Sequence, residues 1–229
     1  MTILHIETTT DVCSIALSCD GKVLFHRLDM QGHNHARVLP LFVDEALSFL
    51  KEETLQLDAV ALSRGPGSYT GLRIGCSMAK GICYGIGTKL IAVDTLKLMA
   101  SMARSKALEM GADCLCPMID ARRMEVYDEL LDTNLNELEP VAAQIIDEDS
   151  FGKQLLRQKV VFLGNGSDKC REVLKHKNAL FLKGIYPDAA CMVSLSEEAF
   201  AKKEFVDVAY YEPFYLKEFQ ATTPKNKVI

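Results

Sequence analysis

The sequence contains no apolar run approaching the roughly 18 residues that a membrane-spanning helix needs. Residues 1–6 lead directly into an apolar strand pattern, without the basic and hydrophobic regions of a signal peptide. We therefore expect a cytoplasmic protein with no membrane partner. The eight cysteines are then expected to be reduced thiols. None of their spacings is C-x-x-C, so we expect no metal site.

Long basic runs are also missing, and the formal net charge is −5. An acidic chain repels a phosphate backbone, so nucleic acid would need a basic partner or a local basic patch to be held. The nearest basic pairs, Arg122-Arg123 and Lys202-Lys203, are interpreted as solvated faces. Apolar residues make up 48% of the 229 residues and charged residues 25%, which is typical of a globular protein with one or two cores.

The same order of predicted elements occurs in both halves of the chain. The first half predicts strands at 3–7, 13–18, 23–28, 59–63 and 90–93, with helices at 35–50 and 70–84 and from 95. The second half predicts strands at 115–120, 125–131, 141–146 and 160–164, with helices from 149 and 167. This duplicated β-β-β-α-β-α unit is the plan of the two-lobed actin-like ATPase fold, in which each lobe is ribonuclease H-like.

We therefore predict an α/β protein with an N-terminal lobe at 1–104 and a smaller second lobe at 105–229. Residues 208–216 are compatible with packing on either lobe. The polar tail after residue 219 is expected to fray.

The strongest local signal is the turn G-P-G-S-Y-T-G at residues 65–71, between a strand and a helix. Free N–H groups at such a helix start can hold an anion, although the local pattern alone favours a tight turn with a good cap. Acidic residues end the first strand of each half, and such positions could hold a nucleotide between two lobes. The candidate nucleotide or anion contacts are Glu7, Thr8, Gly65, Gly67, Ser68 and Asp120.

The helices predicted at 35–50 and 70–84 are apolar around most of their circumference. One sheet covers only one face of each helix, so the other faces need the second lobe or a second protein. In the second helix Gly71, Gly75, Ala79 and Cys83 lie four residues apart, which predicts a smooth ridge for a closely packed backbone.

Candidate catalytic residues are few. His33 and His35 precede a helix without a carboxylate in register, and Ser68 lacks an evident histidine partner. The turns after Glu7 and Asp120 contain no glycine to admit phosphates, which disfavours phosphoryl transfer. We therefore predict no catalytic residue.

Five motifs together resemble the bacterial TsaB (YeaZ) family. They are I-L-x-I-E-T-T-T from residue 3, G-H-x-H-x-x-x-L-P from 32, R-G-P-G-S-Y-T-G-L-R-I-G from 64, I-D-A-R-R-M-E-V-Y from 119 and P-F-Y-L-K from 213. The resemblance implies a non-catalytic scaffold that pairs with its paralogue TsaD, formerly labelled a glycoprotease, to form threonylcarbamoyladenosine beside the anticodon of tRNA. It also implies a homodimer when the chain is alone, a TsaE ATPase as a further partner, and tRNA contact only within the complex.

The same resemblance implies that the chain has no cofactor of its own, with ATP or ADP at the heterodimer interface. TsaD-like proteins carry an H-x-x-x-H metal motif where this chain has Thr95 and Met99. The motif I-D-A-R-x-G-E-V-Y usually has glycine where this chain has Met124. The partner contacts are expected on the two apolar helices, at His35, Val38, Leu39, Phe42, Leu72, Gly75, Met78 and Ile82.

Three alternatives stay open from the residues alone. The first is an ATPase or kinase of the actin-like fold, and the second is a glycoprotease-like metallopeptidase. The third is a homodimeric module that binds a cell-wall or stress factor.

Overall fold

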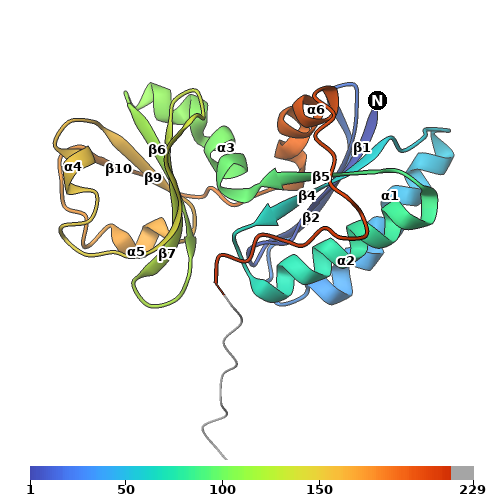
Figure 1. Ribbon diagram of the computed structural model, residues 1–229, viewed down its shortest axis with the longest axis horizontal. Helices are drawn as coiled ribbons and strands as arrows, with labels where there is room; N and C mark the ends of the chain where they lie inside the picture. Colours follow the sequence, from blue (N-terminus) through green and yellow to red (C-terminus); the bar gives the residue numbers. More distant parts are fainter. Residues whose placement is uncertain (218–229) are drawn as a thin grey trace, which may run out of the picture.

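Two five-stranded mixed sheets make up the computed structural model, which describes residues 1–217 (Figure 1). The first sheet has the order β3-β2-β1-β4-β5, with β1 (Thr2–Glu7), β2 (Cys13–Cys19), β3 (Lys22–Asp29), β4 (Ala59–Gly65) and β5 (Lys89–Asp94). The second has the order β10-β9-β6-β7-β8, with β6 (Cys114–Asp120), β7 (Glu125–Asp132), β8 (Glu137–Ile145), β9 (Val160–Leu163) and β10 (Ala179–Leu182). In each sheet three strands form an antiparallel meander, and the remaining two run parallel to the first. The predicted two-lobed α/β fold with a duplicated unit is confirmed.

The crossover helices differ greatly in length between the lobes. In the first lobe, α1 (His35–Glu52) and α2 (Tyr69–Ile86) have 18 residues each, and α3 (Thr95–Glu109) has 15. In the second lobe, α4 (Gly152–Leu155) and α5 (Ser167–Cys170) have four residues each. This shortening explains why the duplication is weak as a residue repeat. No helix within residues 1–217 is long and apolar enough to cross a membrane.

The core lies in layers on both faces of the first sheet. Helices α1 and α2 cover one face, with Leu39 and Ala79 packed against strand residues such as Leu4. Helix α3 covers the other face through Leu98, and its opposite side packs on the second sheet at Leu115. Helix α3 is therefore the layer shared by the two lobes, as its central position in Figure 1 shows.

Three described elements have no counterpart in the sequence prediction: β10, the 3₁₀ helix η1 (Ala189–Met192) and α6 (Val193–Ala201). The strand and η1 are four residues long and α6 is nine, so each is too short for a clear periodic pattern. Strand β8 also begins earlier than predicted, because its start carries two glutamates and Pro140 opposite an irregular part of β7.

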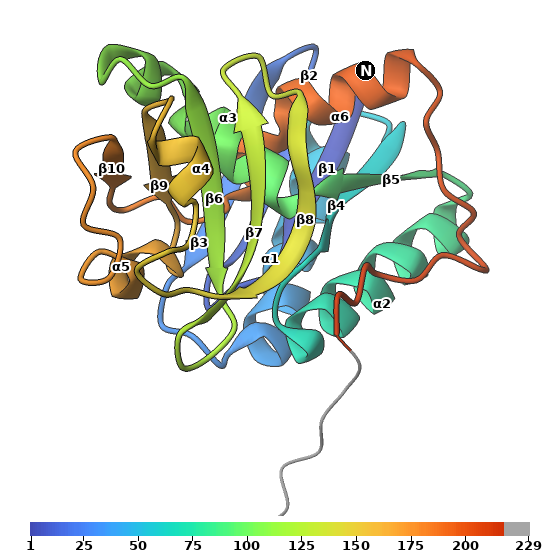
Figure 2. The same cartoon turned by 60° about the vertical axis from the view of Figure 1, so that its left-hand side comes forward.

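After α6 the chain returns along the first lobe as a segment that we call the C-terminal strap, residues 206–217. Val206 N donates to Leu90 O at 3.0 Å, and Phe214 N donates to Arg64 O at 2.7 Å. Lys217 forms an ion pair with Glu125 of the second lobe. The strap thus follows α2, as Figure 2 shows, and touches both lobes. The tail predicted to fray lies outside the described residues.

Candidate functional site

An open apolar groove of about 680 Å³ lies between α1 and α2 on the outer surface of the first lobe. Val43 and Leu47 line it from α1, and Ile74, Met78 and Ile82 line it from α2. The groove is open to solvent along the described surface of the first lobe. Its remaining lining residues are Ala36, Arg73, Ser77 and Gly81.

The outer side of α2 is flat because its residues there are small. Ser77, Gly81 and Gly85 recur every fourth residue, and a Cβ atom built on either glycine would meet nothing within 4 Å. A second helix could therefore approach α2 closely along this line. The sequence interpretation missed Ile74, Ser77 and Gly81, although the four-residue spacing of Ser77, Gly81 and Gly85 could have indicated the last two.

The predicted partner contacts divide into two sets. Met78 and Ile82 line the groove, while Val38 and Phe42 are half-buried against the first-lobe core. The other four are turned inward: His35, Leu39, Leu72 and Gly75 are all buried in the first lobe. These four residues were predicted to contact a partner, but they lie on the side of each helix that packs against the chain itself.

The ridge of Gly71 and Gly75 receives the chain's own loop after β1. A Cβ atom on Gly71 would lie 2.0 Å from Thr8 O, and one on Gly75 would lie 2.3 Å from Thr8 Oγ1. Gly67 is equally confined, since its Cβ would lie 2.4 Å from Thr9 O. The backbone that packs closely against this ridge is thus that of residues 8–9, and not that of a partner helix.

The turn at residues 65–71 is filled by the same loop. Ser68 N donates to Thr9 O at 2.7 Å, and Ser68 Oγ caps α2 by accepting from Gly71 N at 3.3 Å. Gly65 has φ +110°, and its Cβ would lie 2.7 Å from Phe214 O of the strap. The loop after β1 and the strap therefore both pack closely against this turn.

Glu7 is fully buried at the end of β1 and accepts hydrogen bonds from three groups. Thr9 N and Thr9 Oγ1 donate to Glu7 Oε1 at 2.6 and 2.5 Å, and Ser63 Oγ donates to Oε2. Burial raises the pKa of Glu7, while these donors oppose the rise. Thr8 Oγ1 donates to Gly71 O at 2.8 Å. The structure therefore brings five of the candidate contacts together where the loop after β1 packs closely on the turn at 65–71. They are Glu7, Thr8, Gly65, Gly67 and Ser68.

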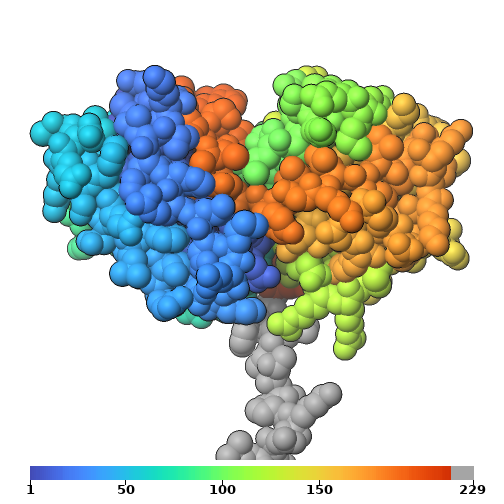
Figure 3. Space-filling view, turned by 180° about the vertical axis from the view of Figure 1, so that it is seen from behind, coloured from blue at the N-terminus to red at the C-terminus, as the bar shows by residue number. Residues whose placement is uncertain are grey.

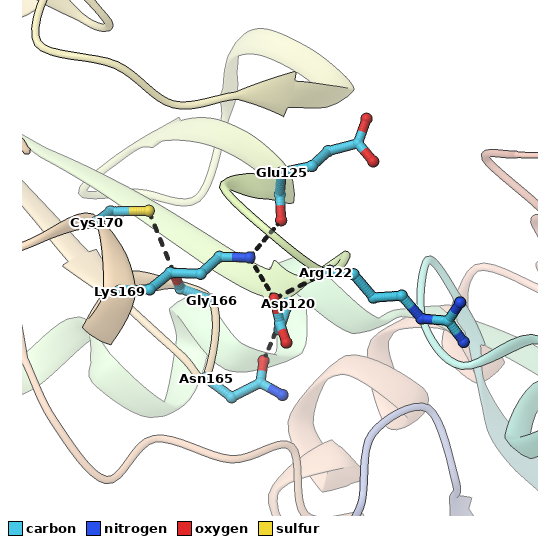
Figure 4. Close-up of polar contacts among 7 residues, drawn as sticks. All are labelled: Asp120, Arg122, Glu125, Asn165, Gly166, Lys169 and Cys170. Carbon is cyan, nitrogen blue, oxygen red and sulfur yellow. Dashed lines mark hydrogen bonds and ion pairs between the residues drawn. The ribbon is translucent and has the colours of Figure 1, made fainter.

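Asp120 belongs to a separate polar cluster at the end of β6 (Figure 4). Its carboxylate forms an ion pair with Lys169 and accepts from Arg122 N at 3.1 Å. Its own backbone N donates to Asn165 Oδ1 at 3.0 Å. Lys169 Nζ also donates to Glu125 O at 2.6 Å, which ties α5 to the start of β7.

The two histidines of the H-x-H pattern are placed differently. His33 is exposed with φ +55°, whereas His35 is buried with Nε2 3.2 Å from Val12 O. Across residues 1–217, no three histidine, cysteine or acidic side chains come together in a way that could hold a metal ion.

Comparison with known proteins is consistent along the whole chain. The family model described as TsaD, tRNA N6-adenosine threonylcarbamoyltransferase, matches residues 29–225. The tRNA threonylcarbamoyladenosine biosynthesis protein TsaB of Escherichia coli is 33% identical over 225 residues, which cover 95% of each chain. The chain belongs to the TsaB family. The solved structure of YeaZ from Pseudomonas aeruginosa agrees, with a TM-score of 0.75 at 26% identity over 94% of this chain and 99% of the other.

The chain is also similar to a transferase of the kind that the family model describes. A tRNA N6-adenosine threonylcarbamoyltransferase of Maridesulfovibrio salexigens is 34% identical over 114 residues, but these are 42% of this chain and 31% of the transferase. Thr95 and Met99, which are expected to correspond to the TsaD metal motif, are both buried in the first half of α3. Thr95 Oγ1 accepts from Gly65 N at 3.1 Å, so this position links α3 to the end of β4.

Proposed function

We propose that this chain is a non-catalytic subunit in the formation of threonylcarbamoyladenosine in tRNA. It pairs with a TsaD-like transferase through the groove between α1 and α2. Membership of the TsaB family supports the pathway, and the apolar groove is the observation that supports pairing.

The chemistry of the groove fits another helix better than a small polar substrate. Its lining is mostly aliphatic, with Arg73 as its single charged side chain. Interfaces that persist are apolar at their centre and packed as closely as a protein interior. The flat line of Ser77 and Gly81 allows that packing without a clash. A partner helix would therefore bury the outer faces that the chain's own sheet leaves exposed.

The absence of a catalytic role is proposed from the residues at the aligned metal motif. Threonine and methionine replace the two histidines there, and neither is a strong ligand for a hard metal ion. Glu7 and the turn at 65–71 are committed to internal hydrogen bonds and close packing. Binding of ATP or ADP would then depend on groups supplied by the partner, and a TsaE-like ATPase would join the pair.

Changing the floor of the groove should prevent pairing while the chain stays folded. Ile82→Asp places a charge on the half-buried outer side of α2, where it would have to be desolvated by the partner. We expect at least a 100-fold weaker association, since a lost hot-spot contact costs about 3 kcal/mol. Light scattering of the chain with the paralogue from the same organism, with and without nucleotide, measures the result.

Leu156→Asp is the matched control, because Leu156 is 77% exposed on the second lobe, away from the groove. It should pair like the natural chain. Circular dichroism must show that both variants are folded. A folded Ile82→Asp chain that pairs normally would contradict the proposed interface, and no complex with the natural chain would contradict the proposed function.

A further inference from the structure

The turn between β6 and β7 carries two consecutive arginines in an unusual backbone conformation. Arg122 has φ +74° and Arg123 has φ +50°. Side chains with a Cβ atom rarely adopt this left-handed region, where glycine or asparagine would be favoured. The stability of the turn therefore does not explain why arginine occupies both positions.

The two guanidinium groups are not used inside the lobe. Both residues are exposed, and within residues 1–217 neither side chain takes part in an ion pair or hydrogen bond. Arg122 is held through its backbone N and O, and Figure 4 shows its side chain extending away from Asp120. In Figure 3 the yellow-green part of the second lobe, which includes this turn, projects from the lower edge of the molecule.

The charge at this turn is positive although the chain as a whole is acidic. The carboxylates on either side of the turn each have a cation already, since Asp120 pairs with Lys169 and Glu125 pairs with Lys217 of the strap. Four cations thus meet two carboxylates, which leaves an excess of two positive charges in a chain of formal charge −5. The excess is carried by Arg122 and Arg123.

We propose that Arg122 and Arg123 bind the phosphodiester backbone of RNA when the chain is in its complex. This inference rests on the proposed function, in which tRNA is the substrate. Guanidinium groups bind phosphate oxygens through paired hydrogen bonds, and exposed arginines reach a polymer backbone without enclosing it. The turn thereby supplies the local basic patch that an acidic chain needs to contact nucleic acid.

The backbone of the turn argues against a free nucleotide as the ligand. A nucleotide phosphate is usually cradled by unpaired backbone N–H groups. Here Ala121 N donates to Glu125 O, Arg122 N to Asp120, and Glu125 N to Arg122 O. These three N–H groups are therefore not free to cradle a phosphate. The exposed arginine side chains offer the positive charge, which suits the outer surface of a folded RNA.

The test uses the complex of the full chain with its TsaD paralogue and a fluorescently labelled, unmodified tRNA transcript. Anisotropy titrations over a range of salt concentrations compare the natural chain with Arg122→Gln/Arg123→Gln. Each lost phosphate contact should lower the slope of log K against log salt by about 0.7 to 0.9, so we expect a decrease of about 1.4 to 1.8 for the pair. Affinity at low salt should fall about tenfold or more.

Lys153→Gln/Arg157→Gln is the matched control, because it removes two exposed cations from the region of α4 on the same lobe. A second variant, Arg122→Asn/Arg123→Gly, relieves the left-handed backbone. It should weaken tRNA binding as much as the glutamine pair, while its thermal midpoint rises above that of the natural chain.

The outcomes separate this inference from the proposed function. Light scattering first establishes that each variant forms the complex, since failure of the natural chain to pair would concern the groove. Unchanged tRNA affinity and salt slope in the glutamine pair would overturn the inference. An equal loss in the α4 control would overturn it too, because the effect would then reflect net charge. Loss of ATP binding by calorimetry, with tRNA binding kept, would assign the arginines to a nucleotide instead.

Discussion

At the scale of single residues, Gly71 shows how closely the loop after β1 packs on α2. An added Cβ atom would lie 2.0 Å from the backbone oxygen of Thr8, which is fixed between β1 and α2. We expect Gly71→Ala to lower the free energy of unfolding by about 2–3 kcal/mol, as overpacking of a rigid contact does. Urea unfolding followed by circular dichroism measures the change.

Gly81 provides the comparison within the same helix. A Cβ atom there meets nothing within 4 Å, so Gly81→Ala should raise the free energy of unfolding by about 0.5–1 kcal/mol through helix propensity. Equal changes in the free energy of unfolding for Gly71→Ala and Gly81→Ala would show that the contact between Thr8 and α2 is not rigid.

Asp128 and Glu129 predict how stability depends on pH. Each is buried in β7, and each has a carboxylate oxygen with no hydrogen-bond partner among the described residues. Burial, with Glu139 nearby, raises the pKa of Asp128 from 3.8 to about 7. Burial, with Asp94 and Glu137 nearby, raises the pKa of Glu129 to about 7, against the opposing effect of Lys97 and Arg64.

The sign follows from proton binding. Between pH 4 and pH 7 the folded chain holds more protons than the unfolded chain at Asp128 and Glu129, so these two groups lower the free energy of unfolding as pH rises, and their effect levels off above about pH 7. Buried His5, whose pKa is lowered to about 3, acts in the opposite direction below about pH 6.5. Asp128→Asn should flatten this decline and be more stable than the natural chain at pH 8 by on the order of 2 kcal/mol. Unfolding midpoints at several pH values test it, with exposed Glu148→Gln as the control. An Asp128→Asn chain with the same pH dependence as the natural chain between pH 5 and pH 7 would contradict the assignment.

At the scale of elements, the sequence was most informative where helices are long. The all-round apolar character of α1 and α2 correctly indicated faces beyond those that the sheet covers. The sequence could not show which face of α2 packs inside the chain and which faces outward, because both glycine series of α2 have the same spacing. Only the fold shows that Gly71 faces residue 8 and that Gly81 faces outward.

The second lobe was harder to predict for the opposite reason. Its crossover helices α4 and α5 have four residues each, too few for a helical period to be visible. The turn at 122–123 was interpreted as a solvated pair, since its backbone conformation and the pairing of nearby carboxylates depend on contacts distant in sequence. Most of the fold was thus predictable, whereas the facing of the site was not.

At the scale of the whole molecule, the C-terminal strap joins the lobes once more, besides α3 and the segment 183–188 that returns from β10 to η1. Removing residues 213–229 would delete the Phe214–Arg64 hydrogen bond, the Tyr69–Tyr215 ring contact and the Lys217–Glu125 ion pair. We expect amides at 121–125 and in the first turn of α2 to exchange with solvent about tenfold faster, since fewer contacts hold them. Hydrogen exchange with mass spectrometry measures this.

The full-length variant Lys217→Gln breaks only the ion pair and should accelerate exchange at 121–125 alone. Helix α6 should keep its protection in both variants, because its contacts with the first sheet do not involve the strap beyond residue 212. Unchanged exchange at 121–125 after truncation would show that the strap does not restrain the second lobe.

The return of α6 to the first sheet has a consequence for biosynthesis. Ile3 and Ile91 emerge early from the ribosome, but Met192 and Ala199, which help to cover them, are translated only after the entire second sheet. The first lobe is therefore started first and completed last. Until then it presents a partly bare apolar face, which makes the nascent chain a natural client for chaperones.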